Sequence, residues 1–321
     1  MVRELYHYCS NEKSYSILTS KSIRLSDIQK SNDYRELNLF FPKILDYIEE
    51  LYQQKPFRLQ CDGKLENEAL SRLLDSSYDY WKKRFLSGGF SNFVLCFSEE
   101  ADSLSQWRGY ANNARGCCLG FSKDDLERYC LSTNGVLQLK QVTYLTDEGI
   151  DNVIRDVAKG ILQTLKRLRR WIVEEITKDN LSPDTDGLLH YNFDGMLESA
   201  FIDSLQYKSI AFREEREWRI FFSRPAYKNP RWVCDKSVEP LQGPNGFAET
   251  IGFLQNRIDF QPTADDLIPY CRIDFEEFAE QPVRSVWLGP ENKIRTSDIE
   301  LFLEIHGYKN TKVISSSITY C

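Results

Sequence analysis

Apolar residues recur three or four positions apart in several long stretches of the chain, and this spacing predicts amphipathic helices. The clearest cases cover residues 35–54 and 147–178. Further helices are expected at these ranges: 11–18, 65–86, 104–110, 191–207 and 297–306. Gly307 follows the last range, and glycine commonly ends a helix.

Shorter apolar runs between charged or glycine-containing segments predict β-strands. Residues 93–99 (FVLCFSE) are expected to form a buried strand, because glycine and charge bound an apolar run there. Other strands are expected at these ranges: 3–9, 22–27, 116–121, 136–145, 270–275, 283–288 and 313–318. The segment 213–222 is expected to end in a strand. Residues 224–248 are rich in Pro, Gly and Asn and predict a long loop.

The strands are distributed along the whole chain with helices in blocks between them, a pattern typical of α+β proteins. We expect one domain over residues 1–321, with helical insertions at about 35–86 and 147–207. The chain has 321 residues, of which 41% are hydrophobic, so it carries enough apolar surface for a sizeable core.

Composition narrows the classes of function. The formal net charge of -7 argues against nucleic acid as the main partner. A basic cluster within residues 166–170 is expected to be the polar face of a helix. No apolar run approaches the ~20 residues that a membrane-spanning helix needs, and the N-terminus has no apolar leader.

Cysteine usage points to a reducing compartment. Several of the nine cysteines lie in apolar runs, none forms a C-x-x-C pair, and only three histidines accompany them. These features predict buried, reduced thiols in a cytoplasmic protein, and no metal site. The common phosphate-loop, dinucleotide-binding, serine-hydrolase and zinc-protease motifs are absent from the sequence.

Three groups of polar residues interrupt apolar sequence, and burying them requires hydrogen-bond partners. The first is His7, interpreted either as a core histidine bound to backbone or as a ligand contact on the first strand. The second group begins at Ser98 and includes Trp107, Arg108 and Tyr110. An arginine fork beside aromatic rings suits phosphate and nucleobase groups, and the alternative is a helix start whose rings belong to the core.

The third group lies in the segment 213–222. Glu215, Glu217 and Arg219 share one face there if the residues alternate as in a strand. Two carboxylates on one face suggest electrostatic or general-base chemistry, and a charged edge strand with mutual ion pairs is the structural alternative. Arg24 adds a further cation within an expected strand.

At these same residues the chain resembles an uncharacterised prokaryotic family, the domain of unknown function 2971. The resemblance rests on LYHYCS, SIRLSD with the following ND and E, FVLCFSE, LSQWRGYA with GCCLGF, and FREEREWRI. It extends from the N-terminus to about residue 222, with a weaker match at VWLGPEN.

More distantly, the chain resembles the ADP-ribosyltransferase fold, which implies a split mixed or antiparallel sheet core with helical insertions. In that fold a first strand carries His or Arg, which here is His7. A later strand carries Ser or an aromatic residue, here Ser98 or Tyr110, and a last strand carries Glu, here Glu215 or Glu217.

The second resemblance implies NAD as a substrate and no metal. The residues implied to contact NAD are His7, Arg24, Ser98, Trp107, Arg108 and Tyr110. The implied catalytic residues are Glu217 and Glu215, of which Glu217 is expected to stabilise the oxocarbenium-like state as nicotinamide leaves.

Two classes of function follow. The resemblance implies an ADP-ribosyltransferase-like transferase or NAD glycohydrolase, and prokaryotic proteins of this kind often act as toxins or anti-phage effectors. Its expected partner is a macromolecular acceptor or a partner protein, with neither a membrane nor nucleic acid favoured. The alternative is a non-catalytic module that binds a ligand or partner within a defence or toxin–antitoxin system.

Overall fold

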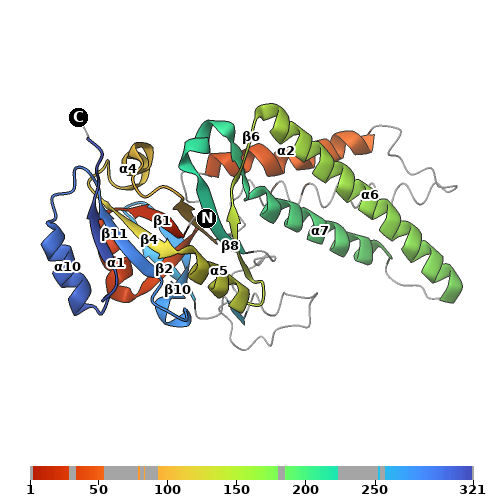
Figure 1. The fold of residues 1–321 in the computed structure, drawn as a ribbon. Helices are drawn as coiled ribbons and strands as arrows, with labels where there is room; N and C mark the ends of the chain where they lie inside the picture. Colours follow the sequence, from red (N-terminus) through yellow and green to blue (C-terminus); the bar gives the residue numbers. More distant parts are fainter. Residues whose placement is uncertain are drawn as a thin grey trace. The chain divides into compact units, whose positions relative to one another are not determined.

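The computed structural model describes residues 3–28, 34–53, 79, 83, 93–179, 185–222, 252–253 and 257–319 (Figure 1). The chain divides into two compact units. Unit 1 comprises residues 1–30, 92–144 and 210–321, and unit 2 comprises residues 31–91 and 145–209. The expectation of a single domain stays a prediction. No helix in the described ranges is both long and apolar enough to cross a membrane.

Unit 1 is built on a ten-stranded sheet with the order β12-β11-β4-β1-β3-β2-β10-β9, and β8 and β5 branch from it at β3. Strands β11 and β12 run parallel, and the other pairings are antiparallel. The α+β class with a mixed sheet is therefore confirmed. The strands are β1 (Glu4–Cys9), β2 (Ser22–Asp27), β3 (Phe93–Ser98), β4 (Cys117–Ser122), β5 (Leu137–Gln141), β8 (Glu217–Phe222), β9 (Ile258–Pro262), β10 (Leu267–Asp274), β11 (Val283–Leu288) and β12 (Lys312–Ser315).

Strand β3 is the branch point of the sheet. One of its edges pairs with β8 from Val94 to Ser98. On the other edge, β1 pairs only at Ser98, and β2 pairs only at Phe93 and Val94. The sheet therefore opens between β1 and β2 along the middle of β3.

The two faces of this sheet differ, because alternate residues of each strand point to opposite sides. One side, here called the core face, carries the main apolar cluster of unit 1. Helices α1 (Asn11–Ser20), α5 (Lys123–Ser132) and α10 (Thr296–Ile305) add residues to this cluster. Representative buried members are Leu5, Leu18, Leu95, Leu119, Leu126, Ile220 and Leu303.

The opposite side, here called the polar face, carries Tyr6, Ser98 and Glu217. Helix α4 (Leu104–Tyr110) packs against β1 on this side, where Trp107 and Tyr8 belong to a smaller apolar cluster. Candidate chemistry is therefore expected on the polar face, beside α4.

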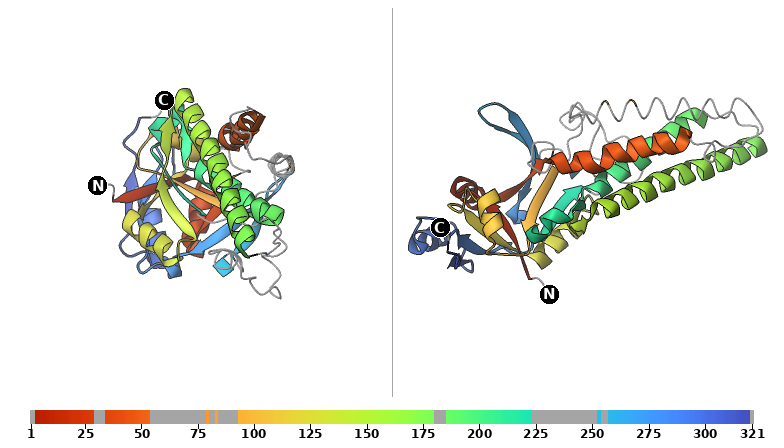
Figure 2. Two further views of the ribbon diagram at one scale, coloured as in Figure 1. Left: turned by 90° about the vertical axis from the view of Figure 1, so that its right-hand side faces the viewer. Right: turned by 90° about the horizontal axis from the view of Figure 1, so that it is seen from above.

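Unit 2 is helical. Helices α2 (Tyr34–Gln53), α6 (Asp147–Asp179) and α7 (Thr185–Ser204) pack against one another, as Figures 1 and 2 show. Phe41 and Phe201 form an edge-to-face contact at 5.1 Å between ring centroids, and both rings are buried. These helices confirm the ones expected at 35–54, 147–178 and 191–207, although α7 begins earlier. The remaining short strands are β6 (Thr143–Leu145) and β7 (Tyr207–Ser209).

Some expected elements fall largely outside the described residues. They are the helix at 65–86 and the loop at 224–248.

Two expected strands differ from the strands in the structure. The strand expected at 136–145 is interrupted at Val142, whose N–H donates to the carbonyl of Glu217 at 2.9 Å. The last strand ends at Ser315 instead of residue 318.

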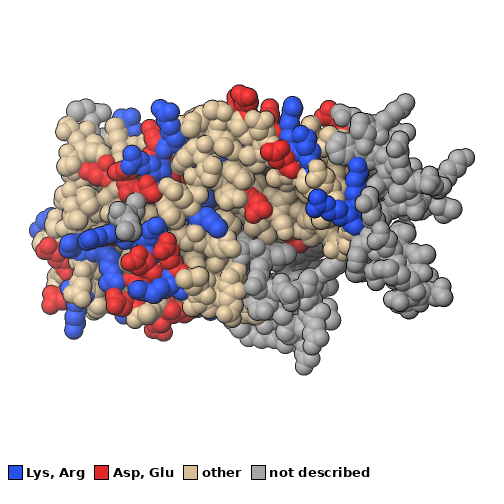
Figure 3. Space-filling view, turned by 45° about the vertical axis from the view of Figure 1, so that its right-hand side comes forward, with Lys and Arg blue, Asp and Glu red and all other residues tan. Residues whose placement is uncertain are grey.

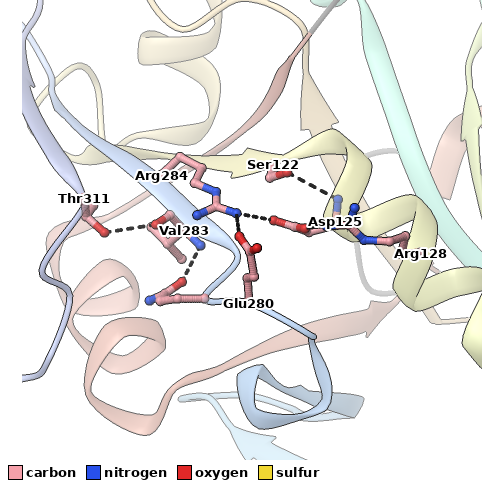
Figure 4. Close-up of polar contacts among 8 residues, drawn as sticks. Ser122, Asp125, Arg128, Glu280, Val283, Arg284 and Thr311 are labelled. Carbon is pink, nitrogen blue, oxygen red and sulfur yellow. Dashed lines mark hydrogen bonds and ion pairs between the residues drawn. The ribbon is translucent and has the colours of Figure 1, made fainter.

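Acidic and basic side chains are interspersed on the face shown in Figure 3. Figure 4 shows one network of ion pairs, which joins α5 to β11. Asp125 is only 3% exposed, and its two carboxylate oxygens pair with Arg128 and, at 2.7 Å, with Arg284. Arg284 also pairs with Glu280 at 2.9 Å. The Ser122 hydroxyl caps α5 by accepting from the N–H of Asp125 at 3.3 Å.

We expect Asp125→Asn to lower the free energy of unfolding by about 2 kcal/mol, because two arginines lose a buried carboxylate partner. Urea denaturation followed by circular dichroism measures this. Glu280→Gln is the control: its side chain is 65% exposed, so the loss should stay below about 0.5 kcal/mol. Equal losses in the two variants would contradict the role given to Asp125.

Candidate functional site

A row of side chains crosses the polar face of unit 1 from β11 to β8. Ser285, Gly120, Tyr6, Ser98 and Glu217 are successive cross-strand partners in the antiparallel register. Directly paired residues point to the same side of a sheet, so these five positions share one face. The row connects the strands that carry the predicted site residues.

Gly120 lies beneath a polar contact in this row. The Ser285 hydroxyl donates to Glu4 at 2.7 Å. A Cβ atom at position 120 would lie 2.2 Å from the Ser285 Oγ and 2.5 Å from the Glu4 Oε2. Only glycine therefore leaves room for this pair. Burial and the nearby Glu4 carboxylate raise the pKa of Tyr6 to about 12, so the phenol remains protonated at neutral pH.

At the β8 end of the row, three predicted residues come together. Glu215 is the last residue of the 3-10 helix η3 (Ile210–Glu215). The Ser98 hydroxyl donates to the backbone carbonyl of Glu215 at 2.7 Å, and the Tyr110 hydroxyl donates to the Glu215 Oε1 at 3.1 Å. Tyr110 is 39% exposed, so the Tyr110–Glu215 pair is open to solvent on at least one side.

Arg216 explains why Glu215 leaves the strand. Its φ of 43° lies in the left-handed region, which reverses the chain between η3 and β8. The Arg216 guanidinium pairs with Glu100, and its carbonyl accepts from the N–H of Glu99 at 3.0 Å. The expectation that Glu215 shares a strand face with Glu217 is therefore wrong, because Glu215 belongs to η3.

Glu217 is engaged in a buried ion pair. The Arg219 side chain donates to both of its carboxylate oxygens, at 2.6 Å and 2.9 Å. Glu217 is 4% exposed and Arg219 is 2% exposed. The backbone N–H of Glu217 donates to the Tyr144 hydroxyl at 2.8 Å. The expected pair of carboxylates is thus divided into a buried Glu217 and a more accessible Glu215.

His7 lies on the opposite side from Ser98 and Glu217. The register pairs Tyr6 with Ser98, so His7 points to the core face, where its ring meets Phe97 edge to face. Its Nδ1 lies 3.0 Å from the carbonyl of Cys96, which requires the proton on Nδ1 because a carbonyl only accepts. Burial lowers the pKa of His7 to about 4, so the ring is neutral at pH 7.

The remaining predicted residues lie at separate places. Trp107 is completely buried, and its Nε1 donates to Asp102 at 2.7 Å, so its ring belongs to the core. Arg108 is exposed on α4, two residues before Tyr110. Arg24 lies on β2, where its Nη1 donates to Gln261 at 3.0 Å.

Sequence reasoning missed several residues of the polar face. They are Glu4, Tyr6, Glu100, Asp102 and Arg216. For Tyr6 a signal was present, because Leu5 and Cys9 are apolar and alternate with His7. Period two assigns His7 to the core with them, and Tyr6 to the other side.

Asp102 anchors the loop after β3 to helix α4 and to the C-terminal segment after β12. It accepts from Trp107 at 2.7 Å and from Ser316 at 2.6 Å, and the Ser317 N–H donates to it at 2.9 Å. Burial alone would raise the pKa of Asp102, but these donors hold it below its usual range. Across the described residues, no group of three or more His, Cys, Asp or Glu is arranged to hold a metal ion.

The fold and these contacts define an α+β protein with a polar sheet face that carries carboxylates and aromatic side chains. A family model described as "Protein of unknown function (DUF2971)" matches residues 106–220, from α4 to β8. The expected family resemblance is confirmed over this stretch, a little over a third of the chain. Neither the curated proteins nor the solved structures gave a match. The resemblance to the ADP-ribosyltransferase fold stays a prediction.

We expect the stability of the protein to fall by about 2 kcal/mol between pH 7 and pH 5 because of His7. Its folded pKa of about 4 lies below the ~6.5 of an unfolded histidine, so the unfolded state takes up the proton first as the pH falls. Urea titrations of wild type and His7→Gln at both pH values isolate this contribution. An identical pH dependence in both proteins would show that His7 is not buried neutral.

We expect Glu217→Ala to cost about 3 kcal/mol of stability, because it removes a carboxylate that accepts two hydrogen bonds from the buried Arg219. The double variant Glu217→Leu with Arg219→Met should recover most of this loss, since an apolar pair needs no partner. Thermal and urea unfolding measure both. If Glu217→Ala is as stable as wild type, the ion pair does not stabilise the fold. Glu217 would then again be a candidate for the catalytic carboxylate.

Proposed function

We propose that the protein is an NAD-consuming enzyme, either an ADP-ribosyltransferase or an NAD glycohydrolase, and that Glu215 is its catalytic carboxylate. One observation carries the proposal. The hydroxyl of a partly exposed tyrosine, Tyr110, donates to the Glu215 carboxylate on the polar face. An aromatic ring beside a carboxylate suits a planar, positively charged ring such as nicotinamide in NAD.

The proposed reaction breaks the bond between the ribose C1′ and the nicotinamide nitrogen. The bonding electrons stay on the nitrogen, so nicotinamide leaves as a neutral ring and positive charge develops on the ribose. A fixed carboxylate stabilises that charge without reorganising solvent, which is the role proposed for Glu215. Water or an acceptor group then bonds to C1′ and releases a proton, which Glu215 is proposed to accept.

The polar groups around Glu215 support this role. Ser98 holds the backbone of Glu215 through the 2.7 Å hydrogen bond to its carbonyl. Tyr110 is a neutral donor, so its contact leaves the charge of the carboxylate in place. Arg108 lies on the same helix as Tyr110 and is exposed, where it is proposed to meet the phosphates of NAD.

A second candidate function is a module that binds its ligand without turnover. This second function is favoured by two ion pairs between arginines and carboxylates in this region. Glu100 pairs with Arg216, and Glu217 pairs with Arg219. Such pairs fix a surface for recognition and reduce the number of carboxylates free for chemistry. Binding of NAD without release of nicotinamide would identify this function.

We expect wild-type protein to release nicotinamide from NAD, and Glu215→Gln to reduce the rate by about 100-fold, because the charge at the developing cation is lost. Tyr110→Phe should reduce the rate by about tenfold, since one hydrogen bond that orients Glu215 is removed. Chromatography of nicotinamide, with and without cell lysate as a source of acceptors, measures both effects.

Glu214→Gln is the matched control. Glu214 is the neighbouring carboxylate and is exposed, so its substitution should leave the rate unchanged. Equal loss in Glu214→Gln and Glu215→Gln would indicate a general effect of charge and would remove Glu215 from the proposed role. No release by wild type under any condition, together with no NAD binding, would reject NAD as the substrate.

A further inference from the structure

Two arginines face each other across β2 and β10. Arg24 and Arg272 are direct partners in the antiparallel register, so both side chains lie on the same face of the sheet. Because Ser26 pairs with Val94 in β3, this is the polar face. Like charges in a direct cross-strand pair repel each other and lower the stability of a sheet. The contact between the two arginines is therefore not itself a source of stability.

Neutral groups hold Arg24 in place. Its guanidinium carbon lies 4.0 Å from the centre of the Tyr270 ring, and its Nη1 donates to Gln261 at 3.0 Å. Within the described ranges Arg24 has no carboxylate as an ion-pair partner. Stacking fixes the plane of the guanidinium and so orients its remaining N–H groups.

Arg272 supplies the second charge. Its side chain is 50% exposed, and its Nε pairs with Asp274 at 2.9 Å. The other acidic neighbour is Asp259, which accepts from the Tyr270 hydroxyl at 3.0 Å and from the N–H of Phe260 at 2.8 Å. The Phe260 N–H and the Tyr270 hydroxyl hold the pKa of Asp259 below its usual range, and the charges of Arg24 and Arg272 add to this effect.

We propose that Arg24 and Arg272 together bind the phosphate groups of a small ligand, a diphosphate such as that of a nucleotide. The planar fork of each arginine matches two oxygens of one phosphate, and two forks on neighbouring strands suit two linked phosphates. A nucleic-acid backbone fits poorly, because the net charge of -7 repels a long polyanion.

This inference goes beyond the proposed reaction. The resemblance implied a contact of Arg24 with NAD but gave Arg272 no role, and the strand register adds Arg272. The pair shares no residue with Tyr110 and Glu215. Binding of a diphosphate at this pair can therefore be tested independently of the release of nicotinamide.

Isothermal titration of the full chain at low salt tests the site with pyrophosphate, ADP, adenosine and a short single-stranded oligonucleotide. We expect pyrophosphate and ADP to bind and adenosine not to bind. Arg24→Gln and Arg272→Gln should each weaken ADP binding by about tenfold, the effect of losing one charged hydrogen-bonding group. Arg24→Lys should weaken it similarly, because an ammonium keeps the charge but loses the planar fork.

Arg295→Gln is the matched control, since Arg295 is an exposed arginine on another element that pairs with Asp298 at 2.9 Å. It should leave the affinity for ADP unchanged, and thermal unfolding should show that all the variants are folded. The proposal is overturned if neither pyrophosphate nor ADP binds, or if adenosine binds as tightly as ADP. Tighter binding of the oligonucleotide than of ADP, or equal affinities in all variants, would overturn it as well.

Discussion

Two strands share one edge of β3, and the arrangement of unit 1 depends on how that edge is completed. Strand β1 pairs with β3 only at Ser98, and β2 pairs with β3 only at Phe93 and Val94. The carbonyl of Cys96 therefore lies in the gap between these two pairings. A buried carbonyl without a donor costs about 1–3 kcal/mol. Nδ1 of His7 supplies the donor from β1 at 3.0 Å. The His7 side chain thus bridges the gap at which the sheet divides.

The far end of the same strand sets the geometry of the candidate site. Ser98 is the last residue of β3, and its hydroxyl binds the carbonyl that ends η3. The next residue, Arg216, adopts a left-handed conformation, which costs a non-glycine residue about 1–2 kcal/mol. Its ion pair with Glu100 and the backbone bond from Glu99 offset that cost. The turn that separates Glu215 from Glu217 is therefore held by the loop that follows β3.

Much of this fold was predictable, because the apolar runs and the helical spacing in the sequence correspond to elements with a buried face. Two of the failures have their cause in contacts between distant residues. The strand expected at 136–145 breaks where Val142 donates to Glu217, and the last strand stops where Ser316 turns toward Asp102. Strand β9 was missed because most of its residues are exposed and give no clear apolar run. The candidate site was predicted as a set of residue types, but the alternation around His7 was not used, and the turn at Arg216 leaves no pattern in the sequence.

The choice between the two glutamates follows from electrostatics. A carboxylate that stabilises a developing cation must be charged, and the substrate must be able to reach it. The field of Glu217 is largely cancelled by the bidentate Arg219, and both groups are buried. Glu215 is less buried than Glu217, and it receives a hydrogen bond from the neutral Tyr110, which orients the carboxylate. The ion pair through which Glu217 stabilises the sheet argues against Glu217 as the catalytic carboxylate of the proposed reaction, and the turn at Arg216 places Glu215 beside Tyr110 instead.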